Sequence, residues 1–179
     1  MKNISFILTV LLFAISCNKK NVMTNPKQSI SKSDTVAVII DTASAFNNNK
    51  VKEFQKNVID KGDPDSFVKL IIHYQDKSNY KELHKYSLIM ADKYNNGDGY
   101  NMVFESTIAL NNNNQYSDIT DFAKINEKAK RESLKYLEKG ASLNDINCMS
   151  MLAEIYRNGI GVEKDIKKAD ELKKKIEKL

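Results

Sequence analysis

The clearest hydrophobic pattern in the chain lies near its end, between Cys148 and Lys175. Apolar residues recur there at offsets 0, 1, 3, 4, 7 and 8, which places them on one face of an α-helix. Gly159 and Gly161 come next, and glycine is favoured where a helix ends or a turn needs a positive φ. Asp165 can cap a second helix with its carboxylate, so the pattern predicts two amphipathic helices joined by a tight turn. The two stripes consist of Cys148, Met149, Met151, Leu152, Ile155 and Tyr156, and of Ile166, Ala169, Leu172 and Ile176.

Two earlier segments, residues 62–74 and 97–109, align with residues 144–156 and indicate an internal repeat. The alignment places Asp63 and Asp98 on Asp145. The first helix of each repeat is therefore expected to begin near position 64, 99 or 146. The partner helices are expected to hold Leu83, Tyr86 and Met90, then Ser133, Tyr136 and Gly140, then Ala169, Leu172 and Ile176. The predicted repeats span about residues 62–94, 95–141 and 142–179.

The last hairpin resembles Sel-one-like repeats, a subfamily of the tetratricopeptide-type helical hairpins. The resemblance rests on the pattern Y-x-x-G-x-G-V-x-x-D-x-x-K-A, which begins at Tyr156, and on Leu152 and Ala153 before it. Leu172 departs from the family, which often has tryptophan there. The resemblance implies an all-α solenoid of about three helix–turn–helix repeats with an N-terminal capping helix, and it implies no activity. The residues expected to shape the repeat are Leu152, Ala153, Tyr156, Gly159, Gly161, Val162, Asp165 and Ala169.

The middle unit carries an asparagine-rich insertion at residues 111–116. Ser117 or Asp118 can cap the next helix, so a long or broken helix is expected from about 118 to 140. Insertions in repeat proteins lie in loops on one face, which is often the binding face. Two tyrosines fall in predicted turns, where exposed contacts are expected. The candidate binding residues are therefore Tyr100, Asn113, Gln115 and Tyr116.

Residues 1–17 have the pattern of an export signal, with an apolar core too short to span a bilayer comfortably. Small Ala14 and Ser16 precede Cys17, and this ending resembles a bacterial lipobox. The resemblance implies that Cys17 is lipidated and anchors the protein in a membrane; an ordinary secretory signal and a short anchor helix are the alternatives. Because Asn18 is not the aspartate of the best-known inner-membrane retention signal, the periplasmic face of the outer membrane is expected.

Residues 18–34 are polar and lack periodicity, which predicts a flexible tether. A helical domain is expected over residues 35–179. Val36–Ile40 is the one β-like run, and a short strand or the start of a helix would both fit it. Apolar residues then recur at helical spacing from Lys50 to Gly62. This stretch predicts a capping helix or the second half of a degenerate repeat.

The composition excludes several functions. The chain has 28 Lys and Arg residues against 23 Asp and Glu residues, and the lysines are mixed with acids throughout. Nucleic-acid binders concentrate basic residues in a patch, so no nucleic-acid partner is expected. Of the two cysteines, Cys148 lies on an apolar stripe, where a buried thiol is expected.

No segment carries a catalytic motif such as H-E-x-x-H, C-x-x-C, G-x-S-x-G or a P-loop. His73 and His84 are too few for a zinc site, which needs three or four ligands. Residues 94–105 partly match an EF-hand calcium loop, but Tyr94 stands where the first carboxylate is required. A helix start capped by Asp98 explains the segment. We therefore expect no enzyme activity, no cofactor and no metal.

Two functions remain. The family resemblance favours a cell-envelope interaction module that binds a protein or peptide through a groove lined by the first helix of each repeat. Export, small size and the loop insertion also fit an immunity-type inhibitor of a secreted or periplasmic toxin. The sequence does not identify the partner.

Overall fold

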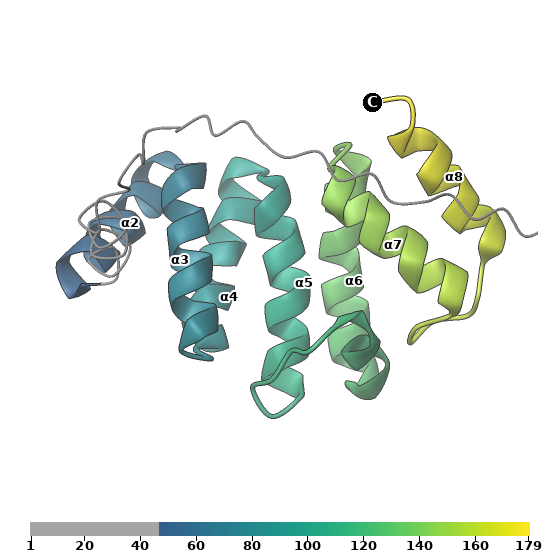
Figure 1. The fold of residues 1–179 in the computed structure, drawn as a ribbon, viewed down its shortest axis with the longest axis horizontal. Coiled ribbons are helices and arrows are strands. Elements are labelled where there is room, and N and C mark those ends of the chain that lie inside the picture. Colours follow the sequence, from purple (N-terminus) through teal and green to yellow (C-terminus); the bar gives the residue numbers. More distant parts are fainter. Residues whose placement is uncertain (1–46) are drawn as a thin grey trace, which may run out of the picture.

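The computed structural model describes residues 47–179, and every regular element in that range is helical (Figure 1). The all-α prediction is therefore confirmed for this part of the chain. The predictions for the signal, Cys17, the tether and Val36–Ile40 lie outside the described residues. Among the described helices, none combines the length and apolar character needed to cross a bilayer. The elements are α2 (Asn48–Lys61), α3 (Pro64–Asp76), α4 (Tyr80–Leu88), the π-helix η1 (Ile89–Lys93), α5 (Gly97–Asn111), the 3-10 helix η2 (Ile119–Lys124), α6 (Glu127–Ser142), α7 (Ile146–Asn158) and α8 (Ile166–Ile176).

Side-chain caps set where the helices begin. Asp145 accepts a hydrogen bond from the Cys148 amide at 2.8 Å, and Asp165 accepts one from the Lys168 amide at 2.9 Å, so the predicted cap at Asp165 is confirmed. The predicted cap at Asp98 is wrong. Asn96 caps α5 instead, because the helix begins at Gly97, two residues earlier than expected.

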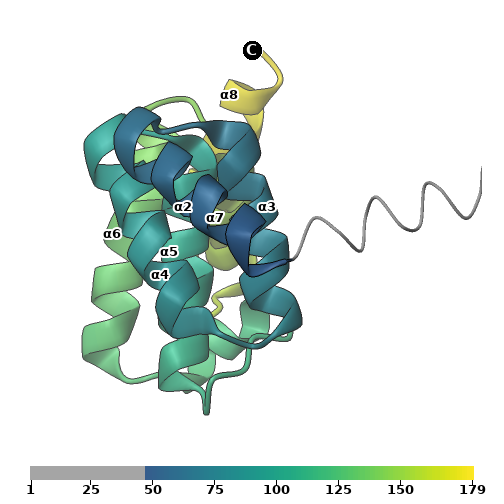
Figure 2. The same cartoon turned by 90° about the vertical axis from the view of Figure 1, so that its left-hand side faces the viewer.

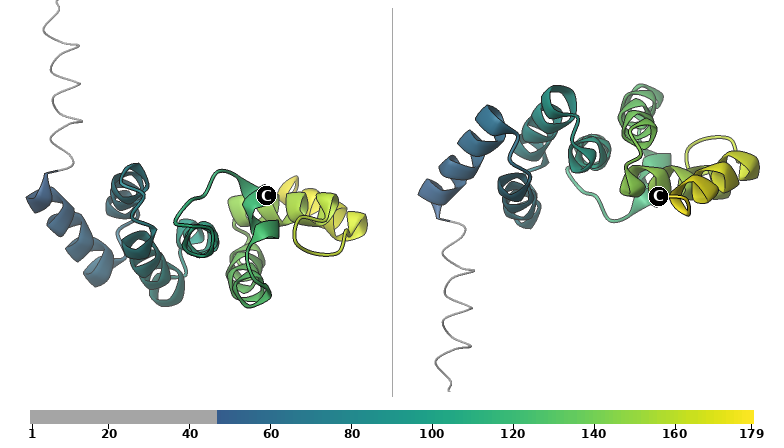
Figure 3. Two further views of the ribbon diagram at one scale, coloured as in Figure 1. Left: turned by 90° about the horizontal axis from the view of Figure 1, so that it is seen from below. Right: turned by 90° about the horizontal axis from the view of Figure 1, so that it is seen from above.

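The helices pack mainly on their neighbours in sequence. Helices α3 and α7 lie on one side of the molecule and α4 and α6 on the opposite side, with α5 between them (Figures 1, 2 and 3). Helix α8 packs against α7 at the C-terminal end. The molecule therefore has two distinct sides, the α3–α7 side and the α4–α6 side.

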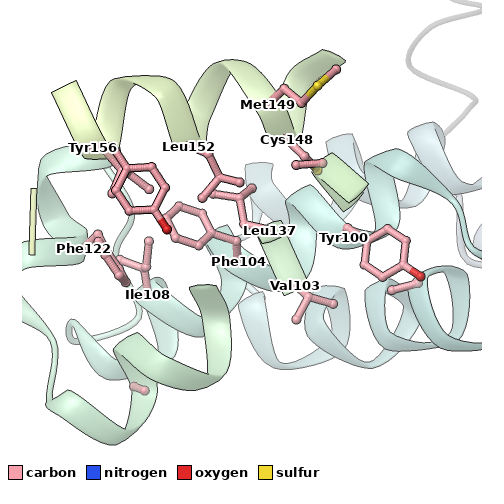
Figure 4. Packing of buried hydrophobic residues seen from close by; sticks show 14 of the residues in the cluster. Tyr100, Val103, Phe104, Ile108, Phe122, Leu137, Cys148, Met149, Leu152 and Tyr156 are labelled. Carbon is pink, nitrogen blue, oxygen red and sulfur yellow. The ribbon is translucent and has the colours of Figure 1, made fainter. Parts of the chain in front are cut away.

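Helix α5 connects two hydrophobic clusters. Tyr100, Val103 and Phe104 belong to a cluster with α6, α7 and α8, whereas Met102 and Ala109 belong to one with α2, α3 and α4. Figure 4 shows the first cluster, where α5 side chains meet those of the later helices. Because helices flank α5 on both sides, its buried residues are spread round the helix rather than along one stripe.

The expected long or broken helix after the insertion is broken. Helix η2 ends at Lys124, and α6 begins only at Glu127, after Asn126 accepts a hydrogen bond from the Ala129 amide at 3.0 Å. Asp118 rather than Ser117 caps η2, through the Thr120 amide at 2.8 Å. Residues 112–126, which include η2, form the connection between α5 and α6, and we call them the α5–α6 loop.

In the last hairpin, most of the residues expected to shape the repeat have an identifiable structural part. Gly159 and Gly161 have φ of 69° and 66°, a region that glycine adopts without strain. The Tyr156 hydroxyl donates to Glu138 of α6 at 2.9 Å and accepts from Lys168 of α8 at 2.6 Å, so it joins three helices. The apolar members Leu152, Ala153 and Ala169 are buried, and Val162 packs against the same cluster.

Candidate interaction face

The α5–α6 loop lies on the α3–α7 side, and its first half has a defined conformation (Figure 1). Asn113 and Asn114 have φ of 51° and 58°, which asparagine tolerates better than most residues. The Asn112 amide donates to the Gln115 carbonyl at 3.2 Å, and the Asn114 amide donates to the carbonyl of Ser78. The loop is thus tied to the turn between α3 and α4.

Asp121 fixes the second half of the loop. Its carboxylate is 2% exposed and accepts hydrogen bonds from the Lys124 ammonium at 2.6 Å and the Ser117 amide at 2.7 Å. The bond from Lys124, together with that from the Ser117 amide, lowers the pKa of Asp121. Phe122 is fully buried, and its ring centroid lies 5.2 Å from that of Phe104. The loop is therefore anchored to the core and holds its outer residues in fixed positions.

The four predicted binding residues differ in accessibility. Asn113 and Gln115 are exposed in the loop, and Tyr116 is half-buried against both hydrophobic clusters. The expectation that Tyr100 is exposed is wrong, because its side chain is 3% exposed. Tyr100 lies in the first turn of α5, where its ring centroid is 6.3 Å from that of Tyr136 on α6, and its hydroxyl donates to Asn95 at 2.9 Å.

Acidic groups surround Tyr116. Burial is the largest cause of the raised pKa of its phenol, and the charge of Glu105 is the next. Asp118, Asp121 and Glu154 raise it further, so all four carboxylates lie near one loop tyrosine. The face beside the loop is consequently acidic, although Lys124 balances Asp121.

Glu105 is the most unusual ionisable group of this face. It lies on α5, and burial raises the pKa of its carboxyl to about 7. Among the described residues, no ion pair or hydrogen bond compensates its charge. The sequence did not predict this property of Glu105, because a glutamate in a helix carries no sign of which helix or loop will cover it.

Helix α3 adds exposed apolar surface on this side of the molecule. Val68 and Ile72 lie one helical turn apart and are 40% and 41% exposed. Large apolar side chains on a surface are individually ordinary, but neighbouring ones beside fixed polar groups are typical of binding surfaces. We use the name α3–α7 face for the surface formed by α3, α7 and the α5–α6 loop.

A histidine–serine contact and a buried thiol lie among the described residues. His84 and Ser106 lie 2.9 Å apart, but Ser106 is fully buried and donates its proton to the Met102 carbonyl at 2.5 Å, so it cannot act as an activated nucleophile. Cys148 is buried as expected, and burial raises the pKa of its thiol. Within residues 47–179, no group of three or more His, Cys, Asp or Glu side chains could hold a metal ion.

Comparison with known proteins adds no assignment: the chain matches no protein-family model, no curated protein and no solved structure.

Proposed function

We propose that this protein is a lipid-anchored interaction module of the bacterial cell envelope, built as a helical-repeat solenoid that binds a protein or peptide on its α3–α7 face. The stepwise packing of α3 to α8 supports a solenoid, since each repeat in such a fold contacts only its neighbours. In this proposal α3/α4, α5/α6 and α7/α8 are the three repeats, and α2, which packs on α3, is the N-terminal cap.

The observation that carries the proposal is the anchored α5–α6 loop. Asp121, Phe122 and the bond from Asn114 to Ser78 fix its conformation from within. The side chains of Asn113 and Gln115 remain exposed, and α3, on the same side of the molecule, adds the exposed apolar residues Val68 and Ile72. Polar groups held in place before binding lose less conformational entropy when a partner docks, which favours a binding role for this loop.

The binding role is tested with two loop substitutions that keep the fold. Asn113→Gly removes the side-chain amide, and glycine tolerates the positive φ at this position. Gln115→Ala removes the second exposed side-chain amide of the loop. We expect the double variant to bind the envelope partner captured by the full tagged chain about tenfold more weakly, measured by surface plasmon resonance. Asn49→Ala, an exposed residue of α2, is the matched control and should leave the affinity unchanged.

Equal affinity of the double variant and the unsubstituted chain would remove the loop from the interface. If the sole tight partner is a secreted hydrolase that loses activity on binding, the protein is an inhibitor and the scaffold proposal fails.

Membrane anchoring is tested separately at Cys17. We expect cells fed radiolabelled palmitate to label the unsubstituted chain and to fractionate it with the outer membrane, because a multiply acylated cysteine is a firm anchor. Cys17→Ser should abolish the label and release the protein from the membrane fraction, whereas Cys148→Ser should change neither. Label retained in Cys17→Ser would contradict the proposed anchor.

A further inference from the structure

The α4–α6 side carries two adjoining cavities that the proposed function does not use. One has a volume of about 420 Å³ and the other about 290 Å³, and Tyr136 of α6 lines both. Together they form a groove between α4 with η1 on one wall and α6 on the other, and we call it the α4–α6 groove. Helix α5 forms its floor through Tyr100, Val103 and Thr107.

Apolar side chains form part of the lining of the larger cavity. Leu88 and Val103 line it, and Leu110 at its edge remains 41% exposed. The larger cavity lies where the two hydrophobic clusters meet along α5, and no described helix covers the apolar side chains that line it. Apolar anchors of a partner would gain free energy by removing this surface from water.

One end of the groove presents hydrogen-bond acceptors. Because the hydroxyl proton of Ser106 goes to the Met102 carbonyl, Nδ1 of His84 must donate to Ser106. Burial lowers the pKa of His84, so the ring is neutral at pH 7 and its Nε2 is an acceptor. No other group in residues 47–179 bonds to Nε2. Glu132 lines the same cavity, where its only ionic partner in the described range is Lys128 at 3.9 Å.

The other end presents cations. Lys135 and Lys139 line the smaller cavity, and neither has an acidic partner within the described part of the chain. The one carboxylate there, that of Asp92 on η1, accepts a hydrogen bond from the Tyr136 hydroxyl at 3.2 Å. The groove thus has an acceptor end at His84 and Glu132 and a basic end at Lys135 and Lys139.

The spacing of these ends selects the form of the occupant. Glu132 and Lys139 are seven residues apart on α6, which corresponds to about 10.5 Å along the helix axis. In a second helix lying along α6, residues seven apart span the same distance and point to the same face. In an extended strand, two residues this far apart are about three positions apart in sequence, so their side chains point to opposite faces.

We propose that the α4–α6 groove binds an amphipathic helix of a partner protein. That helix carries a Lys or Arg and, seven residues away, an Asp or Glu, with apolar residues between them and another one helical turn beyond the basic residue. The basic residue meets Glu132 and Nε2 of His84, and the acidic residue meets Lys135 and Lys139. The apolar residues between them cover Leu88, and the one beyond the basic residue covers Leu110, because α5 runs antiparallel to α6 and Leu110 lies near the start of α6. This site is separate from the α3–α7 face, so a result that disproves binding at one of the two sites does not affect the proposal for the other.

The test uses the full chain in detergent micelles and a set of fluorescein-labelled, helix-stabilised peptides with the pattern Φ-x-x-x-Arg-x-x-Φ-Φ-x-x-Glu, where Φ is Leu, Ile, Phe or Met. Fluorescence anisotropy should show saturable binding for at least one peptide. Leu110→Ser should weaken that binding about tenfold. Ile72→Ser, an equally exposed apolar residue of α3, is the matched control and should have no effect. Circular dichroism checks that both variants remain folded.

Charge reversal supplies the decisive comparison. Glu132→Lys should weaken binding of the Arg peptide about tenfold, and a peptide with Glu in place of that Arg should restore it. The proposal is overturned if no peptide binds saturably, if Ile72→Ser weakens binding as much as Leu110→Ser does, or if the reversed pair fails to restore affinity.

Discussion

Replacing Phe104 with alanine is expected to lower the free energy of unfolding by about 3–5 kcal/mol, the usual cost of removing a buried phenylalanine. Phe104 is fully buried on α5 and packs against Phe122 of the α5–α6 loop, with ring centroids 5.2 Å apart (Figure 4). The cavity left by the substitution would border α5 and the loop together. Since a domain of this size is stabilised by about 5–15 kcal/mol in total, the loss is a large part of it.

Urea denaturation followed by circular dichroism measures the Phe104 effect. Leu143→Ala is the control, because Leu143 is 44% exposed and its truncation should change the free energy of unfolding by less than about 0.5 kcal/mol. A loss below about 1 kcal/mol for Phe104→Ala would mean that the Phe104 and Phe122 rings do not pack α5 against the loop.

Replacing Glu105 with glutamine is expected to stabilise the protein at pH 8 by about 3 kcal/mol. Burial raises the pKa of Glu105 from its ordinary value of 4.5 to about 7, so at pH 8 the folded state holds an ionised carboxylate that is less well solvated than in the unfolded chain. Each pKa unit corresponds to about 1.4 kcal/mol, which gives this magnitude. Glutamine keeps the shape of the protonated side chain and has no charge to desolvate.

The pH dependence of the Glu105 effect has a definite sign. Below about pH 4.5 the carboxyl is protonated in both states, so the two proteins should be equally stable there. Between pH 4.5 and 7 the folded state binds more protons than the unfolded state, so the unsubstituted protein loses stability as the pH rises. Above about pH 7 the difference from Glu105→Gln should be complete and constant.

Urea denaturation at pH 4, 6 and 8 measures this difference directly. Glu154→Gln is the matched control, because Glu154 is an exposed glutamate on α7 near the same loop tyrosine and should show no comparable gain. An equal free energy of unfolding for Glu105→Gln and the unsubstituted protein at pH 8 would show that solvent reaches the Glu105 carboxylate.

Local sequence signals predicted the helix starts well where a cap and an apolar stripe coincide. Helices begin at Pro64 and Ile146 as expected, each after an aspartate whose side chain accepts a backbone hydrogen bond. The same reasoning failed at α5, where Asn96 and Asp98 both precede apolar residues. A cap acts over one helical turn, so two polar residues this close compete, and local sequence offers no basis for choosing between them.

The candidate binding residues show a different limit of prediction. Asn113 and Gln115 lie in a turn that no helix covers, so their exposure follows from local sequence. Tyr100 was placed wrongly because α6 covers it: its ring centroid lies 6.3 Å from that of Tyr136, and local sequence does not show that contact. Neither Asp121 as the anchor of the loop nor the α4–α6 groove could be predicted, since each depends on segments brought together from different helices.

The sequence by itself therefore determined the helical character of residues 47–179, the hairpin after Cys148 and the position of the exposed loop. Periodicity, capping and the φ preference of glycine all act within a few residues, and those few residues are present in the sequence. Tertiary structure alone decided the burial of Tyr100, the partial burial of Glu105, the anchoring of the loop through Phe122 and the groove between α4 and α6. Burial depends on what lies across from a side chain, and a single helix does not specify its neighbours.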